Sequence, residues 1–499
     1  MNYPFWDIPH LGSGWVIGII AIFHVMISQF AVGGGLYLPM AERKAMRMPE
    51  GPLRTAWLNQ LASYSKFFLI LTAVFGTVSG VGIWFAIGLT HPEATSTLIH
   101  NFVFGWAMEW VFFLVELTTI AVYYTTWGKI DEKLHLTVGW VYAGASAFTL
   151  IIINGILTFM LTPGDTWLAV AGTGQEASKF WYAFFNPTYW PSLFLRSCVC
   201  CALAGVWALI TSSRIDGDKQ PELKTSMVKW SAKWLVPSFV ATPFLLVWYL
   251  WMVPESQRAL LLLGMDTIGF GTFAIITRIA LLIILTSATI VGVTYFLAYR
   301  NPTDFNLSHA IAILLLALIA TGAGEYSREM LRKPYVIGGW MYSNGVRVPS
   351  VARINQEGYL THSNWVWNNC NYEHAAWKGS NGDDPEFLTG EAYKAYWKCA
   401  SIGSSTSYSR GEAIFRGECG SCHTLDGYRP LRSLLSGRDR ANIGSFITML
   451  HDYKPDSPYH RFMPPMSGIK QDIDDLTDYL NYQVNPPQTT TQPAQTAQK

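Results

Sequence analysis

Two cysteines three residues apart, followed at once by a histidine, form the most specific chemical motif in the chain: Cys419, Cys422 and His423. Two thiols at this spacing can bond the two vinyl groups of a haem, and the adjacent imidazole is then held at the iron. A predicted helix, SRGEAIFRGE, precedes the motif. We therefore predict one covalent c-type haem. A zinc site or a redox dithiol is the alternative.

The sixth ligand of this haem iron is predicted to be a methionine. A thioether raises the potential of haem iron relative to a second histidine. Met463 stands directly before two prolines, Met466 is the runner-up, and His451 and His460 are outside candidates. The motif, the Met-Pro-Pro sequence and the amphipathic stretch QDIDDLTDYLNYQ together resemble a small class I cytochrome c domain. In that family the axial methionine stands where Met463 does here.

A second set of chemically competent residues is ionisable but lies within long apolar runs. It consists of His24, Glu109, Glu116, Arg196, Arg278, Glu325, Arg328, Glu329 and Arg332. Charges inside a membrane span are costly and usually functional. Glu109 and Glu116 are two helical turns apart and share a face, so they could pass protons inward. His24 is either a haem ligand or an imidazole bonded to a neighbouring side chain, and the last four charges could instead pair with one another.

The elements that must position these residues are membrane helices. The 499 residues are 50% hydrophobic and only 14% charged, with a net charge of +1, which excludes an ordinary soluble enzyme and a nucleic-acid binder. Runs of about 20 apolar residues can cross a bilayer. We predict eight spans, over 13–41, 67–90, 102–127, 136–162, 190–213, 234–253, 267–299 and 307–331.

The loops give the orientation and the domain plan. Thirteen basic residues lie in the loops after odd-numbered spans, against two in the N-terminal stub and the loops after even-numbered spans, which places the N-terminus outside. The first run does not resemble a cleavable signal peptide. We predict an all-α chain: a polytopic helix bundle (1–333), an extracytoplasmic connecting segment (334–408), an α-helical cytochrome c domain (409–484) and a disordered tail (485–499). Cys370 and Cys399 form either a disulfide or two thiols in this outer part.

Residues 10–340 resemble the large subunit of cytochrome bd oxidases. The similar stretches are AIFHVMISQFAVGGGLYLPMAERKA, FGTVSGVGIWFAIGLT, GWAMEWVFFLVELTTIAVYY and GEYSREMLRKPYVIGG. The resemblance implies that His24 and Glu329 are axial ligands of two adjacent haems. Arg332 matches the arginine of the family's Gly-Arg-Gln-Pro-Trp motif, whereas Lys333 and Tyr335 depart from that motif. It also implies that Glu109 and Glu116 are the paired carboxylates of the proton path.

Other positions depart from the family. Its low-spin haem b is held by a His and a Met, and the corresponding positions here are Arg196 and Ala280. Arg278 matches an arginine that the family places near a haem propionate, and Arg196 could anchor a propionate too. The long quinol-binding loop is reduced to PESQRALLLLGMD, and the predicted haem c domain stands where the family has a ninth helix.

These features predict a respiratory oxidoreductase subunit of the bacterial inner membrane, with its cytochrome c domain on the periplasmic side. Electrons would enter through haem c and pass to one or two non-covalent haems, b or d, where dioxygen is reduced to water. The alternative is an electron-transfer subunit that links a quinone pool or another redox complex to periplasmic cytochromes. The expected partners are a second membrane subunit, a cytochrome c or similar carrier, and quinol; nucleic acid is not expected.

Overall fold

The computed structural model describes residues 6, 8–259, 274–332, 335–362 and 410–486. The described residues are mostly helical, and their strands are one short antiparallel hairpin, β1 (Tyr335–Ile337) with β2 (Met341–Tyr342). The predicted all-α class is confirmed. The described residues divide into two compact units. The bundle unit draws on Ile17–Gly88 and Ala94–Tyr342, and the C-terminal unit on Met1–Val16, Leu89–Glu93 and Ser343–Lys499.

Eight helical stretches among the described residues are long and apolar enough to cross a membrane. They are α1 (Ser13–Met46), α2 with η1 and α3 (Pro52–Leu69, Ile70–Gly76 and Thr77–Thr90), α5 (Val103–Thr125), α6 (Glu132–Leu161), α9 (Tyr189–Ser212), α10 (Pro221–Met252), α12 with η3 (Ala274–Val293 and Thr294–Tyr299) and α13 (Leu307–Arg332). The eight predicted spans are therefore confirmed in number and order, although the start of the seventh lies outside the described residues.

Several helices extend beyond the apolar runs that predicted them. Helix α1 continues to Met46 rather than ending near residue 41. Helix α6 begins at Glu132 rather than 136, because the Asp131 carboxylate accepts hydrogen bonds from the amides of Lys133 and Leu134 and so caps the first turn. Hydropathy marks the part of a helix that suits lipid, whereas these caps and polar turns decide where the helix itself begins or ends.

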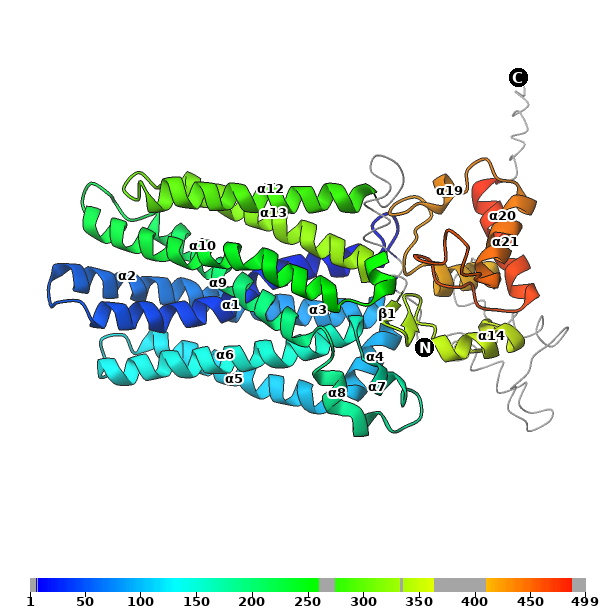
Figure 1. The fold of residues 1–499 in the computed structure, drawn as a ribbon, viewed down its shortest axis with the longest axis horizontal. Coiled ribbons are helices and arrows are strands. Elements are labelled where there is room, and N and C mark those ends of the chain that lie inside the picture. The colour runs from blue at the N-terminus through cyan, green and yellow to red at the C-terminus, as the bar shows by residue number, and fades with distance from the viewer. Residues whose placement is uncertain (1–5, 7, 260–273, 333–334, 363–409, 487–499) are drawn as a thin grey trace, which may run out of the picture. The chain divides into compact units, whose positions relative to one another are not determined.

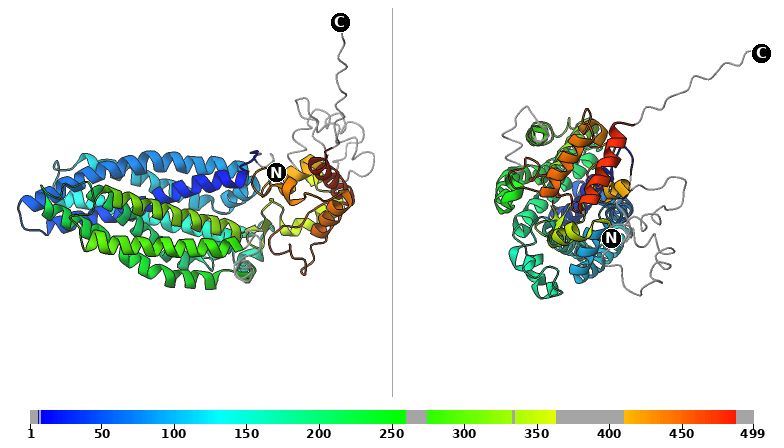
Figure 2. Two further views of the ribbon diagram at one scale, coloured as in Figure 1. Left: turned by 90° about the horizontal axis from the view of Figure 1, so that it is seen from above. Right: turned by 90° about the vertical axis from the view of Figure 1, so that its right-hand side faces the viewer.

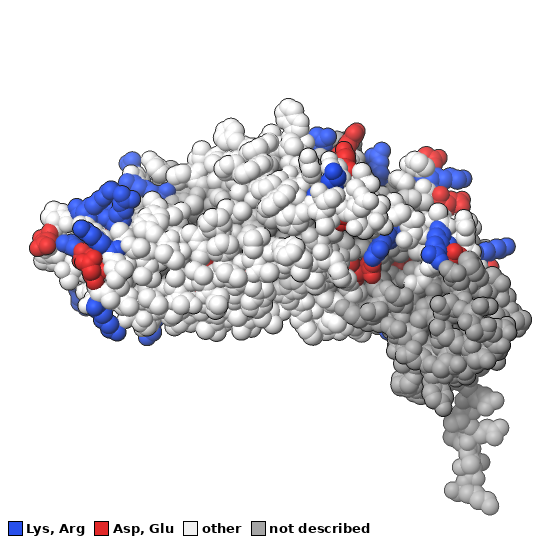
Figure 3. Space-filling view, turned by 90° about the horizontal axis from the view of Figure 1, so that it is seen from below, with Lys and Arg blue, Asp and Glu red and all other residues white. Residues whose placement is uncertain are grey.

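The long helices of the bundle unit run side by side, parallel or antiparallel to one another (Figures 1 and 2). The loops α1–α2, α5–α6, α9–α10 and α12–α13 meet at one end of this bundle (Figure 1). Figure 3 shows Lys and Arg side chains, with a few Asp and Glu side chains, gathered at one end of the bundle, next to a broad band that is almost free of charged side chains. This grouping agrees with the predicted topology; which membrane side that end faces stays a prediction.

An apolar cluster holds the bundle together and includes the fully buried side chains of Phe30, Trp57 and Phe305. Helices α1 and α9 approach closely at Gly33, where an added Cβ would overlap the carbonyl of Cys200. Lipid gives no hydrophobic drive for helix association, so such close backbone contact at small residues is a main source of packing energy.

Shorter elements complete the bundle unit at the end opposite the basic loops (Figure 1). They are α4 (Pro92–Asn101), α7 (Asp165–Leu168), η2 (Glu176–Lys179) and α8 (Phe180–Phe184). A second apolar cluster, with Phe102, Phe159 and Trp167 at its centre, joins them to the β1–β2 hairpin. Trp181 and Tyr182 remain exposed, as amphipathic aromatic rings do at a membrane–water interface.

The described elements of the C-terminal unit are short helices: η4 (Val348–Ser350), α14 (Val351–Glu357), η5 (Leu360–His362), α18 (Arg410–Ile414), η6 (Phe415–Cys419), α19 (Leu431–Leu434), α20 (Arg440–Asp452) and α21 (Lys470–Val484). Helices α18 and α21 cross at Gly411, where an added Cβ would overlap the carbonyl of Asp475. Beside the crossing, the rings of Phe415 and Tyr479 lie 5.6 Å apart. This crossing fixes the helical turn that leads into the cysteine motif.

Candidate functional site

The cysteine motif lies at the end of the π-helical turn η6. The amide of Cys422 donates to the carbonyl of Cys419 at 3.0 Å, and the amide of His423 donates to the same oxygen at 2.9 Å. One helical turn therefore brings the three side chains together. Two thiols and an imidazole on a single turn are the donor set for a covalently attached haem.

The imidazole of His423 is oriented by the loop that follows it. Its Nδ1 lies 2.9 Å from the carbonyl oxygen of Arg429, so this nitrogen carries the proton and Nε2 has the lone pair. The loop is closed by Thr424, whose amide and hydroxyl both donate to the carbonyl of Tyr428, at 3.1 and 3.0 Å. A backbone acceptor on one ring nitrogen is a common way to fix a histidine that binds metal through the other.

Both candidate methionines lie between α20 and α21. Met466 is buried; its amide donates to the carbonyl of Leu450 at 3.3 Å, and its own carbonyl lies 3.1 Å from Nδ1 of His451. Met463 is half-buried, and its amide donates to the carbonyl of Tyr459 at 2.9 Å. Nδ1 of His451 is engaged with the chain in this way, which leaves its Nε2 available, so the choice of Met463 as the axial ligand stays a prediction.

Glu418, directly before the first motif cysteine, is buried and is contacted from an earlier segment. Asn344 Nδ2 donates to its Oε2 at 2.7 Å, while its Oε1 has no hydrogen-bond partner in the described part of the chain. Burial raises the pKa of Glu418 well above its usual value of 4.5, and Asp472 nearby raises this pKa further. Tyr359 joins the same pocket: its amide donates to Asp472 at 2.9 Å. Residues 343–362 thus pack around the motif.

His24 lies on α1, half-buried, with its Nδ1 3.0 Å from the hydroxyl of Ser79 on α3. That hydroxyl also lies 2.6 Å from the carbonyl of Phe75, to which it donates, so towards His24 it acts as the acceptor. Nδ1 therefore carries the proton, and Nε2 is left with the lone pair. The π-helical segment η1 ends just before Ser79, and such segments are frequent at functional sites. An imidazole held in this way can serve as a haem ligand.

Glu109 and Glu116 lie on α5, separated by about 10 Å along the helix axis at 1.5 Å per residue. Glu109 is half-buried, whereas Glu116 is buried and accepts a 2.5 Å hydrogen bond from the hydroxyl of Thr149 on α6. A buried carboxyl with a hydroxyl partner can exchange a proton along a short hydrogen-bonded path. The spacing that the sequence indicates is therefore present, and α6 supplies a partner that the sequence did not identify.

Arg196 ends a chain of polar contacts between α9 and α6. Its Nε donates to Ser192 at 3.2 Å, the Ser192 hydroxyl donates to Asn154 at 2.7 Å, and Asn154 donates to the carbonyl of Tyr189 at 3.0 Å. Helix α9 contains no histidine. This part of the bundle therefore presents a guanidinium and amide network rather than an imidazole.

The remaining predicted residues divide into three groups. Arg278 is on α12 with an exposed side chain. Glu329 and Arg332 are on the last turns of α13, but their side chains lie outside the described residues. Glu325 and Arg328, one turn earlier, form an ion pair at 2.7 Å, so at least this part of the cluster pairs internally. Cys370 and Cys399 fall outside the described residues.

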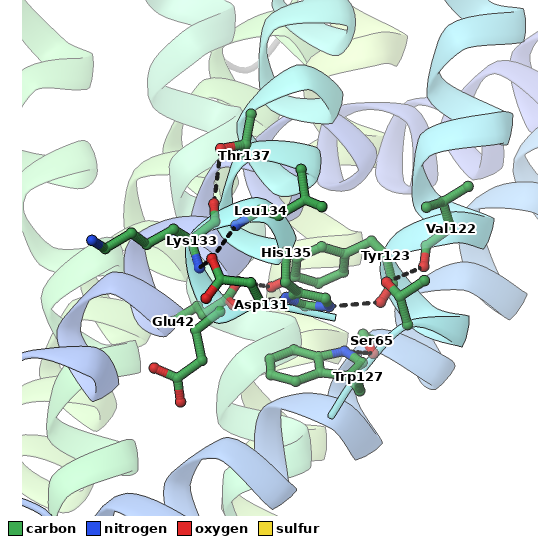
Figure 4. Close-up of polar contacts among 12 residues, drawn as sticks. Glu42, Ser65, Val122, Tyr123, Trp127, Asp131, Lys133, Leu134, His135 and Thr137 are labelled. Atoms are coloured by element: carbon green, nitrogen blue, oxygen red, sulfur yellow. Dashed lines mark hydrogen bonds and ion pairs between the residues drawn. The ribbon is translucent and has the colours of Figure 1, made fainter. Parts of the chain in front are cut away.

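The structure also reveals a buried polar cluster that the sequence did not identify. Glu42 on α1 accepts hydrogen bonds from the Tyr123 hydroxyl at 2.8 Å and from His135 Nδ1 at 2.7 Å. His135 Nε2 lies 2.9 Å from the carbonyl of Tyr123, and the imidazole is covered by the ring of Trp127 (Figure 4). The predicted spans 13–41 and 136–162 leave Glu42 and His135 just outside their ends. The N-cap signal at Asp131 could have moved His135 into the helix.

Comparisons with known proteins find similarity to bd oxidases in the helix bundle. Residues 13–245 match the family model described as cytochrome bd terminal oxidase subunit I. The chain is 23% identical over 183 residues to cytochrome bd-II ubiquinol oxidase subunit 1 of Escherichia coli (strain K12), a match that covers 36% of this chain and 34% of that relative. The chain thus spans about a third of the length of this curated relative.

A solved structure shares the fold. The bd oxidase from Geobacillus thermodenitrificans superposes with a TM-score of 0.53 at 16% identity, covering 66% of this chain and 90% of the other. The bundle therefore has a bd oxidase-like fold, and residues 13–245 match the sequence model of cytochrome bd terminal oxidase subunit I. Helices α12 and α13 and the cysteine motif lie beyond the residues that the family model matches.

Proposed function

We propose that this chain, a multi-pass membrane protein similar to subunit I of bd oxidases, is a respiratory oxidase subunit with an electron entry site of its own. Electrons would arrive from a periplasmic cytochrome c or similar carrier at a haem c held by Cys419, Cys422 and His423. Dioxygen would be reduced at one or two haems, b or d, held by His24 and Glu329. The observation that carries the proposal is the donor set on one turn in a chain that also has the bd fold.

Bound haems of these types would carry single electrons, and one with an open coordination position would bind dioxygen. The residues around them have separate tasks. Arg429 holds the His423 imidazole through its carbonyl, and Ser79 does the same for His24 through its hydroxyl. Met463 or Met466 would complete the outer site.

Three arginines would neutralise the negative charge of the haem propionates. Haem propionates are anionic, and a guanidinium pairs with a carboxylate through two parallel hydrogen bonds. Arg332 and Arg278 stand at positions similar to such residues in the family. Arg196, already fixed by Ser192, would serve in the same way in the bundle.

Protons for dioxygen reduction would move past Glu116 and Glu109. The Thr149 hydroxyl holds Glu116 in one orientation, and the two carboxyls share one side of α5. Each carboxyl would take up a proton from one side and release it to the other. This is the role that we assign to both residues.

A second membrane subunit is the expected partner. Helices α5 and α10 expose large apolar side chains, with Phe104, Phe244 and Trp251 each about three-quarters exposed. Such faces meet either lipid or another membrane helix. Subunit I of bd oxidases normally pairs with a second subunit and uses quinol, and quinol therefore stays a candidate donor.

A membrane electron-transfer subunit without oxygen chemistry is the second candidate. The network of Arg196, Ser192 and Asn154 favours it. Helix α9, which carries Arg196 and Ser192, contains no histidine, and electron transfer between outer carriers and a quinone pool would not require the complete oxidase haem set.

Spectra of the purified membrane protein separate the two functions. Reduced-minus-oxidised spectra with and without carbon monoxide reveal an open haem site, and a pyridine haemochrome assay counts covalent haem. The oxidase proposal predicts a carbon monoxide shift together with oxygen consumption when reduced cytochrome c is supplied. No carbon monoxide shift would favour the electron-transfer subunit, and a c-type haem that survives Cys419→Ser with Cys422→Ser would refute the entry site.

A further inference from the structure

The segment of residues 8–16, which leads into and begins α1, packs inside the C-terminal unit against the loop 424–431. The amide of Tyr428 donates to the carbonyl of His10 at 2.7 Å, and the ring of Trp15 meets the ring of Tyr428 edge-on with centroids 5.9 Å apart. Residues more than 400 positions apart in the sequence are therefore held together by backbone and ring contacts.

The fit between the two segments is tight at two glycines. A Cβ added at Gly427 would overlap the carbonyl and Cα of His10, so a larger residue there would push the segment away. A Cβ added at Gly12 would lie 3.3 Å from the Thr424 methyl, closer than most real Cβ contacts. The contact thus depends on the absence of side chains at both positions.

Backbone strain is also concentrated at this contact. Three non-glycine residues in the described part of the chain have a positive φ, and two of them are His10 at 66° and Arg429 at 46°. Such conformations are unfavourable for residues with a Cβ and persist only where surrounding contacts impose them. An observed outlier of this kind is a reason to look for a function, and Arg429 is the residue whose carbonyl holds the His423 imidazole.

We propose that residues 8–16 are a positioning element of the outer haem site. They hold the peptide of Tyr428, and through it the carbonyl of Arg429 that accepts from Nδ1 of His423. A hydrogen bond at Nδ1 raises the basicity of the imidazole as a metal ligand. If residues 8–16 lose their contact with Tyr428, the His423 imidazole therefore donates less electron density to the iron, and the reduction potential of the haem rises. The inference rests on the proposed covalent haem and adds a residue-level control of its potential.

The test compares Gly427→Ala with Gly444→Ala in the full-length membrane protein. Gly444 is a matched control, because an added Cβ there meets its nearest atom, in Thr477, at an ordinary 3.4 Å. Hydrogen exchange reports the contact without any haem: we expect the Tyr428 amide to exchange about tenfold faster in Gly427→Ala, as a backbone hydrogen bond is lost. Redox titration should show a higher midpoint potential of haem c in this variant only.

A second pair of variants tests the same contact in case Gly427→Ala does not fold. Trp15→Ala removes the ring contact without adding bulk, and Trp15→Phe keeps an aromatic edge on Tyr428, so the potential should rise in the first and return towards wild type in the second. Faster exchange with an unchanged potential, or no change in either, overturns the inference alone. A wild-type protein without covalent haem overturns the proposed function together with this inference, so the two failures are distinguishable.

Discussion

The carboxylate of Glu42 and the imidazole of His135 lie 2.7 Å apart, and each side chain is only 3% exposed. They join α1 to α6 at the end of the bundle where the basic loops meet. The Tyr123 hydroxyl donates to the second carboxylate oxygen, and aromatic rings cover the imidazole. A buried carboxylate is tolerated only when its oxygens are bonded, so this cluster is a structural requirement of the bundle.

Removing one partner should therefore destabilise the bundle. We expect His135→Ala to lower the free energy of unfolding by about 3–5 kcal/mol, because it leaves the Glu42 carboxylate buried with one bond fewer. Thermal unfolding in detergent, followed by tryptophan fluorescence, measures the change. Glu50→Gln is the control: Glu50 is 94% exposed beside Arg54, and its loss should leave the melting temperature unchanged. Equal melting curves for wild type and His135→Ala would show that the cluster is not needed.

The hydrogen bond from Thr149 to Glu116 gives a prediction about proton delivery. We expect Glu116→Gln to slow oxygen consumption by about a hundredfold, the contribution of a positioned proton carrier. Thr149→Val should slow it about tenfold by releasing the carboxyl, and Thr149→Ser should restore most of the rate. The matched control is Thr137→Val on the same helix, whose hydroxyl donates only to its own helix. A wild-type rate in Glu116→Gln would remove this residue from the path.

Ser79 should strengthen haem binding at His24. Ser79→Ala removes the acceptor at 3.0 Å that orients the imidazole, so we expect the affinity for this haem to fall about 10–100-fold. The pyridine haemochrome assay should show partial loss of one non-covalent haem, and complete loss in His24→Ala. His100→Ala, an exposed imidazole bonded to its own helix, should keep the full complement. If His24→Ala retains every haem, another residue is the ligand.

Local signals were enough to predict the membrane helices and the cysteine motif. About 20 consecutive apolar residues are enough to identify a membrane span, and five consecutive residues ending at His423 are enough to identify the cysteine motif. Neither prediction depends on distant parts of the chain. The shared face of Glu109 and Glu116 follows from helical periodicity alone. These were the features that a single sequence could carry.

The partners of these residues could not be predicted in the same way. Thr149 reaches Glu116 from another helix, Asn344 reaches Glu418 across 74 positions, and His10 meets Tyr428 across the whole chain. Each pairing is fixed by tertiary packing. Helix ends were a second source of error, since Glu42 lies beyond the apolar run of α1 yet is still helical and faces the core.

The buried carboxyl of Glu418 predicts a pH dependence for the C-terminal unit. In the folded protein its pKa is raised well above 4.5, mainly by burial, so above pH 4.5 the folded state holds a proton that the unfolded chain releases. Stability should therefore fall as pH rises from 4.5 towards the raised pKa, by up to about 1.4 kcal/mol per pH unit for one proton.

Glu418→Gln should remove that dependence, because a neutral amide can still accept from Asn344 and needs no proton. We expect wild type and variant to unfold at similar temperatures near pH 5 and the variant to unfold at a higher temperature at pH 8. Glu412→Gln, which breaks a partly exposed pair with Arg416 at 3.0 Å, is the control and should keep the wild-type pH profile. Parallel profiles for wild type and Glu418→Gln would mean that this carboxyl is already ionised in the folded protein.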